Sequence, residues 1–235
     1  LCGDFPKKLG GFTFEDEIVR LHMFFPKVAA RIACSFFDVP RKKEGDIVKI
    51  VPPILKNQVI TLKRSPKTSR PSLLAYISSA REFVQDLKDL LPIFQSQKQA
   101  EFHLFVRPSE VEALKTPQNE MIHIYPHGSP AFKEVLATCS GIVSTAGHSL
   151  LSEAMYLGIP VYAIPVSPYE QHMNAYVIGK HGFGTSFPRL SKSKLADFIK
   201  NLPRFRANIK KDKEVLVRGV GQHQIIKFLE KEFLS

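Results

Sequence analysis

The chain has 235 residues, is 44% hydrophobic and carries 33 Lys and Arg against 22 Asp and Glu, a net charge of +11. This length and apolar content suffice for one sizeable core or two small ones. No run of about 18 apolar residues is present, so no segment is expected to span a membrane. Cys2, Cys34 and Cys139 have no C-x-x-C spacing, which argues against a disulfide framework or a zinc site and favours a cytoplasmic location.

The positive charge suits an anionic partner: a nucleoside diphosphate, a lipid phosphate, an anionic membrane surface or nucleic acid. A solvated lysine-rich surface is the simpler alternative. The basic residues are dispersed, as at Arg41-Lys42-Lys43 and Lys210-Lys211, with no basic strand interleaved with aromatic residues. Nucleic acid is therefore the least favoured partner, and a peripheral position at the membrane remains open.

The first part of the chain has mixed patterning. A helix-like apolar stretch is expected from Ile18 to Cys34 and a strand from Asp46 to Val51. Residues 63–72 read K-R-S-P-K-T-S-R-P-S, which is typical of a linker or exposed loop. We therefore expect residues 1–68 to be the remnant of an N-terminal domain with its linker, and residues 69–235 to be a complete second domain.

After Pro71, short apolar strands alternate with helices. The expected strands span residues 73–77, 102–106, 121–125, 141–144 and 161–164, and the expected helices span residues 81–94, 131–139, 149–157, 172–180, 192–201 and 222–233. This alternation predicts an α/β fold: a Rossmann-like parallel sheet with helices on both faces. Ligands of such sheets bind beyond the carboxyl ends of the strands.

Polar residues follow four of these strands. Ser78-Ser79 follow the first strand, the loop from Tyr125 to Ser129 the third, the turn that begins at Ser144 the fourth, and the loop from Pro165 to Gln171 the fifth. The carboxyl ends of parallel strands lie at one edge of a sheet, so these loops are expected to converge. The Ser144 turn precedes a helix, whose unpaired N–H groups are suited to a phosphate.

The stretch from Ser140 to Ala175 carries the most specific pattern. It reads SGIVSTAGHSLLSEAMYLGIPVYAIPVSPYEQHMNA: a buried strand, a Ser-Thr-Ala-Gly turn, a helix that contains Glu153, and a later Glu-Gln pair. Phosphate donors, a carboxylate that can bind hydroxyls and a polar pair sized for a sugar together suggest a nucleotide-sugar site.

On S-T-A-G-H-S-L-L-S-E-A, G-I-P-V, E-Q-H-M-N-A and G-F-G, the chain resembles the C-terminal, donor-binding domain of two-domain (GT-B) glycosyltransferases. The similar group includes the bacterial peptidoglycan N-acetylglucosaminyl transferase, plant and animal UDP-glycosyltransferases, and uncharacterised bacterial and archaeal relatives. The earlier V-P-P-I-L-K and L-L-A-Y-I-S-S resemble the crossover into that domain in the uncharacterised relatives. The resemblance covers residues 51–234.

The resemblance implies that the turn and the helix start bind the diphosphate. The residues implied in this cradle are Ser144, Thr145, Ala146, Gly147, His148 and Ser149. Ser78 and Ser79 would touch phosphate from the first strand-to-helix turn. Ordinary helix caps and a helix-start glycine are the alternative reading of the cradle, and a packing role is the alternative for His148.

The same resemblance places the nucleoside and the sugar. Glu153 would accept hydrogen bonds from the ribose hydroxyls, and Tyr125 and its neighbours would hold the base. Glu170 and Gln171 would contact hydroxyls of the transferred sugar, while Asn174 would brace their loop or reach a phosphate. A solvent-facing carboxylate is the alternative for Glu153, and a plain polar loop is the alternative for the Glu-Gln pair.

Departure of a nucleoside diphosphate leaves an oxocarbenium-like sugar and growing negative charge on the phosphates. Backbone N–H groups and a helix dipole can stabilise that charge without a metal. No Asp-x-Asp pair is present, and His123, His127, His172 and His181 show no ligand spacing. The resemblance therefore implies inverting transfer from a nucleotide sugar, UDP being favoured, with no metal and no cofactor.

In GT-B proteins, the acceptor site and the general base lie mostly on an N-terminal Rossmann domain, and only 68 residues precede the expected donor domain here. A truncated chain is the favoured expectation; a separate acceptor-domain subunit is an alternative. A lipid-linked acceptor suits the basic surface. Other classes remain open: a non-catalytic nucleotide-sugar binding module, a UDP-sugar epimerase and a purely structural fragment.

Overall fold

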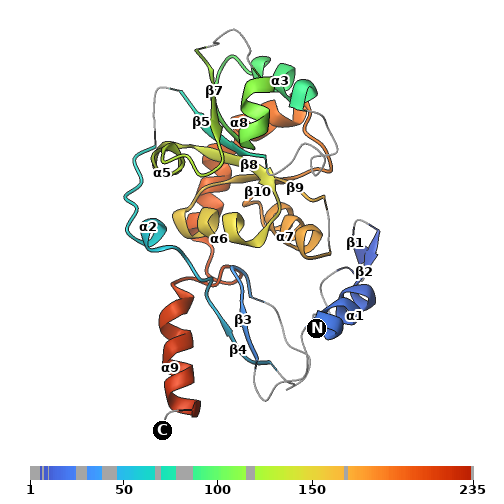
Figure 1. Cartoon of the computed structure of the whole chain (residues 1–235), viewed down its shortest axis with the longest axis vertical. Helices are drawn as coiled ribbons and strands as arrows, with labels where there is room; N and C mark the ends of the chain where they lie inside the picture. Colours follow the sequence, from blue (N-terminus) through green and yellow to red (C-terminus); the bar gives the residue numbers. More distant parts are fainter. Residues whose placement is uncertain are drawn as a thin grey trace.

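The centre of the molecule is a six-stranded, wholly parallel sheet (Figure 1). The computed structural model describes residues 6, 8–9, 11–24, 31–38, 47–66, 70–77, 87–114, 120–166 and 169–233. Within those residues, no helix combines the length and the apolar character that crossing a membrane requires.

The sheet follows a doubly wound order. Its strands are β5 (Ser72–Tyr76), β6 (Glu101–Val106), β7 (Ile122–Pro126), β8 (Gly141–Thr145), β9 (Val161–Ile164) and β10 (Gly184–Ser186). They lie in the order β10-β9-β8-β5-β6-β7, so the chain builds outward from β5 on one side and then restarts at β8 on the other. A crevice opens at such a switch point, between the carboxyl ends of β5 and β8.

Helices cover both faces of the sheet. They are α3 (Leu87–Gln95), α4 (Pro108–Ala113), α5 (Ala131–Thr138), α6 (His148–Leu157), α7 (Tyr169–Lys180) and α8 (Lys192–Lys211). Successive strand residues point to opposite faces. Leu74 and Ile142 accordingly join the buried cluster of α5, α6 and α7, whereas Leu73 and Val143 join that of α3 and α8.

The predicted α/β sheet is confirmed, and the five expected strands end within one residue of their predicted limits. Helix α8 differs: it continues to Lys211, through Pro203, rather than ending at residue 201. Buried Phe198, Leu202 and Phe205 recur at helical spacing across that proline, so their burial outweighs the break that proline favours. The sequence analysis missed β10 and α4, and residues 81–86 of an expected helix lie outside the described residues.

The N-terminal part contains short elements. They are the hairpin of β1 (Lys8–Leu9) and β2 (Phe12–Thr13), α1 (Phe14–Phe24), the parallel pair β3 (Arg31–Cys34) and β4 (Ile47–Val51), and α2 (Asn57–Ile60). The expected helix over residues 18–34 is therefore wrong at its end, where pairing with β4 draws the chain into a strand. The last helix, α9 (Gly221–Phe233), lies beside β4 (Figure 1).

The start of the expected linker is fixed to the end of α5. The Arg64 guanidinium donates to the carbonyls of Leu136 and Cys139, and the Ser65 N–H donates to Ala137 O at 3.0 Å. These contacts satisfy carbonyls that the end of α5 leaves without helical partners. The predicted domain boundary at residue 68 lies within residues 67–69, which are outside the described residues, and it stays a prediction.

Gly184 offers a direct test of the β9–β10 pairing. A Cβ at this position would lie 1.9 Å from Val161 O, a backbone atom that cannot swing aside. We expect Gly184→Ala to lower the free energy of unfolding by about 1–3 kcal/mol, as overpacking does. Gly179→Ala is the matched control, because its Cβ would meet Ser186 Cβ at an ordinary 3.6 Å. Chemical denaturation of the two variants should separate them, and equal stability would contradict the pairing.

Candidate functional site

The turn between β8 and α6 presents backbone rather than side chains to solvent. Ser144, Thr145 and Ala146 are buried, Gly147 and His148 are half-buried, and Ser149 is exposed. Gly147 is the N-cap of α6, with φ −66° and ψ 137°, so no hydroxyl or carboxylate at the cap position covers the first helical N–H groups. A Cβ on Gly147 would meet nothing within 4 Å, so the space above the turn is open. An anion can therefore approach these N–H groups.

Asn174 fastens α7 to this turn. Its Nδ2 donates to Ala146 O at 2.9 Å and to Glu170 Oε1 at 3.3 Å, and its side chain is almost fully buried. His148 packs its ring 5.6 Å from that of Phe36, and burial lowers the pKa of the imidazole while the Glu170 carboxylate opposes the shift. The beginning of α7 and the beginning of α6 thus form one unit.

Glu170 and Gln171 lie in the first turn of α7, not in the loop that the sequence suggested. Helix α7 begins at the buried Tyr169, and Asn174 in its second turn bonds both to Glu170 in the first turn and to Ala146 O. Gln171 Oε1 accepts the Val166 N–H at 3.2 Å, so this side chain also supports the segment after β9. The structure therefore brings Glu170, Gln171 and Asn174 together beside the β8–α6 turn.

A pocket of about 450 Å³ opens at the carboxyl ends of the strands, between α5 and α6. This volume is within the range of small-molecule sites. The lining residues come from α6, from the turn after β7, from α5, from the end of β5 and from the segment around α2: Ser149, Leu150, Glu153, Gly128, Ser129, Pro130, Phe132, Lys133, Tyr76, Lys56 and Gln58. The pocket thus adjoins the switch point between β5 and β8.

Glu153 supplies a carboxylate to the pocket from the second turn of α6. The residue is only 8% exposed, and burial raises the pKa of its carboxyl above the ordinary value, which the Lys56 ammonium partly opposes. Lys56 and Lys133 also line the pocket. A buried acceptor with two cations nearby is suited to a ligand that carries both hydroxyls and negative charge.

An aromatic stack forms the wall on the β7 side. The rings of Tyr76 and His127 are 4.6 Å apart and inclined by 11°, and His127 lies within 3.0 Å of Phe105 O. Tyr125 stacks on Phe105 instead, at 5.0 Å, with its hydroxyl 3.3 Å from His103 Nδ1. Of the residues predicted to hold the base, those of the turn after Tyr125 line the pocket, whereas Tyr125 itself is not a lining residue. Ser78 and Ser79 lie outside the described residues.

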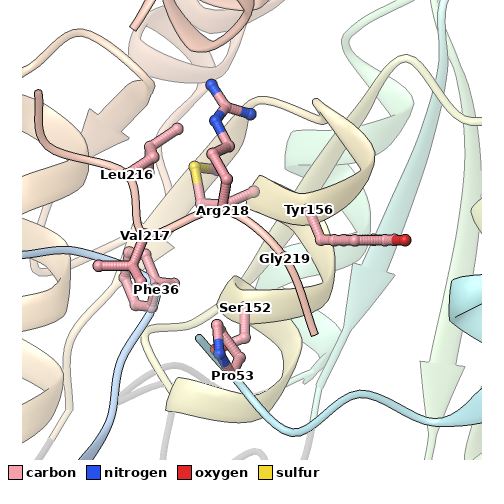
Figure 2. A pocket seen from close by; sticks show the side chains of 9 residues that line it. Phe36, Pro53, Ser152, Tyr156, Leu216, Val217, Arg218 and Gly219 are labelled. Carbon is pink, nitrogen blue, oxygen red and sulfur yellow. The ribbon is translucent and has the colours of Figure 1, made fainter. Parts of the chain in front are cut away.

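A second cavity, on another side of α6, is too small for a nucleotide. Figure 2 shows Ser152 and Tyr156 of α6 beside it, with Phe36 and Pro53 among the residues opposite. Its volume is about 20 Å³, enough for roughly one water molecule. Of the two cavities, the one that contains Glu153 is the candidate ligand site.

The sequence analysis did not single out Lys56, Tyr76, Phe132 or Lys133 as pocket residues. Lys56 ends the V-P-P-I-L-K segment and Tyr76 lies within L-L-A-Y-I-S-S, the two segments that carried the resemblance at the crossover. Their position in those segments was a signal that could have identified them. Phe132 and Lys133 lie on the pocket-facing start of α5 and have no comparable pattern.

Comparison with known proteins places the chain among glycosyltransferases. The model of glycosyl transferase family 1 matches residues 11–203. MurG from Acinetobacter baumannii is 14% identical in sequence, with a TM-score of 0.58, over 95% of this chain and 64% of that one. No curated protein matches the chain significantly.

Two structures determined with thymidine diphosphate are also similar. Glycosyltransferase SsfS6 from Streptomyces sp. SF2575 is 17% identical over 88% of this chain and 53% of that one, with a TM-score of 0.53. Glycosyltransferase VinC is 17% identical over 73% of this chain and 43% of that one, with a TM-score of 0.54. The chain spans less than two thirds of the length of each of these proteins. Together with the family match, these similarities confirm the predicted GT-B fold.

The buried carboxylate predicts a pH-dependent gain in stability for Glu153→Gln. Below about pH 4 the carboxyl is protonated in the folded and the unfolded chain, and the substitution changes little. As the pH rises, the unfolded chain ionises first because the folded pKa is raised, and the native protein loses stability. At pH 7 the variant should be more stable by about 0.5–2 kcal/mol, the usual gain from relieving such a site.

Urea denaturation at pH 4 and pH 7 measures this difference. Glu134→Gln, on the exposed face of α5, is the control that removes a carboxylate without burial. An equal effect of Glu153→Gln at both pH values would contradict the raised pKa.

Proposed function

Because the chain belongs to glycosyl transferase family 1, we propose that it binds a nucleoside diphosphate sugar, with UDP as the nucleotide, at the switch point of its sheet. In this proposal, the protein transfers the sugar to an acceptor with inversion and without a metal. The observation that carries the proposal is the 450 Å³ pocket, which contains the Glu153 carboxylate and adjoins the open start of α6.

The diphosphate would lie on the β8–α6 turn. The cradle of the proposal is Ser144, Thr145, Ala146, Gly147, His148 and Ser149, and its donors are chiefly backbone N–H groups, because the first three of these residues are buried. The positive end of the α6 dipole and the Lys56 and Lys133 ammonium groups favour negative charge there. Ser78 and Ser79 remain proposed phosphate contacts.

The nucleoside would occupy the pocket itself. Glu153 would accept hydrogen bonds from the ribose hydroxyls, and these hydrogen bonds are stronger when the carboxyl group is ionised. The base would lie against the turn that follows Tyr125, where Gly128 and Ser129 form the wall together with the ring of Phe132. The backbone of that turn can recognise the base edge, and the aromatic ring supplies apolar area.

The sugar would lie beside the first turn of α7. Glu170 and Gln171 would contact its hydroxyls. Asn174 would fix the position of these two residues relative to the β8–α6 turn through its bond to Ala146 O. Transfer would then be driven by the preorganised N–H groups of the β8–α6 turn, which stabilise charge on the departing diphosphate. We assign only the donor site to residues 69–235, and we leave the acceptor site and the general base to another part of the protein or to a separate subunit.

A nucleotide panel tests the donor site. UDP, GDP, dTDP and CMP, each alone and sugar-linked, are added at one common concentration, a hundredfold above the dissociation constant of UDP, at which UDP stabilises the protein by about 2.7 kcal/mol. We expect selective stabilisation by UDP and its sugars. Loss of the carboxylate in Glu153→Gln should weaken binding by about 1.5–3 kcal/mol, the value of a hydrogen bond to a charged group.

Gly147→Ala separates binding from folding. Its φ of −66° and the open space around it allow alanine, so stability should change by less than about 1 kcal/mol. A diphosphate that approaches the turn closely would meet the new methyl group, and UDP affinity should fall.

The outcomes of these experiments distinguish the alternatives. Stabilisation without transfer to any acceptor would favour a binding module, and turnover of the sugar without an acceptor would favour an epimerase. No shift with any nucleotide would contradict the donor site.

We further propose that the protein acts at an anionic membrane surface, on a lipid-linked acceptor. The net charge is +11, and Val19, Met23 and Phe24 expose apolar side chains together on α1. Sedimentation with anionic vesicles should show binding that falls at least severalfold as salt rises from about 50 to 500 mM, because screening weakens surface electrostatics. Neutral vesicles are the control, and salt-independent or absent binding would contradict this location.

A further inference from the structure

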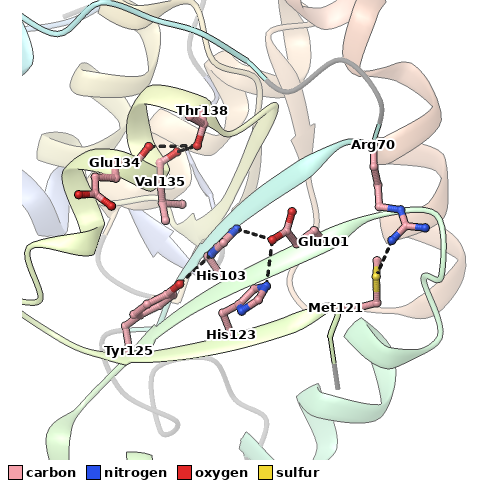
Figure 3. A network of polar contacts seen from close by, with 9 residues as sticks. All are labelled: Arg70, Glu101, His103, Met121, His123, Tyr125, Glu134, Val135 and Thr138. Atoms are coloured by element: carbon pink, nitrogen blue, oxygen red, sulfur yellow. Dashed lines mark hydrogen bonds and ion pairs between the residues drawn. The ribbon is translucent and has the colours of Figure 1, made fainter. Parts of the chain in front are cut away.

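A cluster of side chains bridges the two outermost strands on the β7 side of the sheet (Figure 3). Glu101 and His103 lie two residues apart on β6, so they point to the same face. His123 of β7 is the register partner of His103, and Tyr125 is that of Phe105. The rings of His103 and His123 stack 4.8 Å apart, inclined by 17°. Strand pairing thus assembles groups from two strands whose paired residues are 20 positions apart in the sequence.

The potential ligand atoms of this set converge. Glu101 Oε1 is 3.4 Å from His103 Nε2 and 2.9 Å from His123 Nε2, and one atom from each of the three residues lies within 4.8 Å of the others. Around a tetrahedral ion with bonds of about 2.0–2.2 Å, neighbouring ligand atoms are about 3.3–3.5 Å apart. The two separations from Glu101 are close to that value, and rotation of the two stacked imidazole rings toward a common point would place all three atoms on one ion.

We propose that Glu101, His103 and His123 form a binding site for a divalent transition-metal ion, Zn²⁺ above all. Two imidazole nitrogens and one carboxylate oxygen are a ligand set that zinc accepts, with a water molecule in the fourth position. Imidazole favours ions of this class over Mg²⁺ and Ca²⁺, which take oxygen ligands. The spacing of His123 in the sequence predicted no ligand role, because the neighbour that completes the set lies on another strand.

The surroundings also fit a metal site. The Tyr125 hydroxyl lies 3.3 Å from His103 Nδ1, and a hydrogen bond there leaves Nε2 for the ion. Such an outer partner is what fixes the ring orientation of metal-binding histidines. The His103 side chain is buried, at 9% exposure, whereas that of His123 is 37% exposed. His103 is thus enclosed in the sheet face, whereas the His123 ring reaches solvent although its Nε2 is buried beside Glu101.

The position of the cluster indicates a structural role. Glu101 is the first residue of β6, so the cluster begins at the amino end of the strand, whereas the nucleotide pocket adjoins the carboxyl ends. Strand β7 is an edge strand, and a bound ion would tie it to β6. The competing explanation is a metal-free, cross-strand contact of histidine with carboxylate, which needs His123 and Glu101 but draws nothing from the second imidazole.

Titration of the chelator-treated chain with Zn²⁺ distinguishes these explanations. We expect one ion per chain, and a hundredfold excess over the dissociation constant should raise Tm by about 5–10 °C. Mg²⁺ at the same excess concentration should not. His123→Gln and Glu101→Gln should weaken Zn²⁺ binding by about 100-fold or more, and Tyr125→Phe by about 10–100-fold. His223→Gln, at an exposed position on α9, is the matched control and should bind as the unaltered chain does.

Three results would overturn the site: no binding of one Zn²⁺ per chain, equal affinity in His123→Gln and His223→Gln, or an equal Tm shift with Mg²⁺. The visible absorption of bound Co²⁺ gives a readout on the unaltered chain, which does not depend on whether a variant folds; an octahedral rather than a tetrahedral spectrum would contradict the ligand set. The nucleotide-induced shift in Tm is measured separately, in the presence of chelator. Because the proposed donor site requires no metal, failure of the zinc site would leave that shift unchanged.

Discussion

The pairing of β8 on both sides is the constraint on which the site depends. Strand β8 hydrogen-bonds to β5 on one side and β9 on the other, and all five of its residues are buried. A strand held in this way has one register available, because a shift by one residue would exchange the residues of its two faces. The end of β8 therefore fixes the height at which α6 begins, and that height sets the distance from the helix start to the end of β5.

The buried polar residues of this region lower the stability of the fold. Their arrangement indicates what they contribute in return. Burial of a carboxylate or an amide destabilises a protein unless partners compensate. The Asn174 Nδ2 group has such partners in Ala146 O and Glu170, and these two bonds join α6 to α7. Glu153 instead faces a pocket, and burial raises the pKa of its carboxyl. A buried acceptor that faces open space is what a ligand with hydroxyl groups can complete.

Much of the sheet could be predicted from the sequence because burial on both faces leaves a direct record. The strands at residues 141–145 and 161–164 are short apolar runs bounded by turn residues. The helix between them has apolar residues at helical spacing. Helix limits were less predictable where a distant contact decides them. Glu170 lies in the first turn of α7, which the bond from Asn174 to Ala146 O fastens to the β8–α6 turn, and no local pattern indicates this contact.

The same reasoning explains which site residues were found and which were missed. Residues of the β8–α6 turn and Glu153 lie in one continuous segment, so their spacing could be interpreted directly. Lys56 and Tyr76 reach the pocket from segments about 100 and 80 residues away in the sequence. Their arrival depends on the strand order, in which β5 lies next to β8. A single sequence contains the residues that line the pocket, but it does not indicate that residues from distant segments lie side by side.

Strand β7 shows how an edge can serve both ends of a sheet. An edge strand exposes unpaired backbone groups, and proteins protect such edges with charged or polar side chains. At its amino end β7 presents His123 to Glu101, and at its carboxyl end it leads into the turn of Gly128 and Ser129 that lines the pocket. The contact of His127 with Phe105 O then ties that turn to β6. Because a strand moves as a unit along its register, any interaction that fixes β7 on β6 also fixes the pocket wall, even where it touches no ligand.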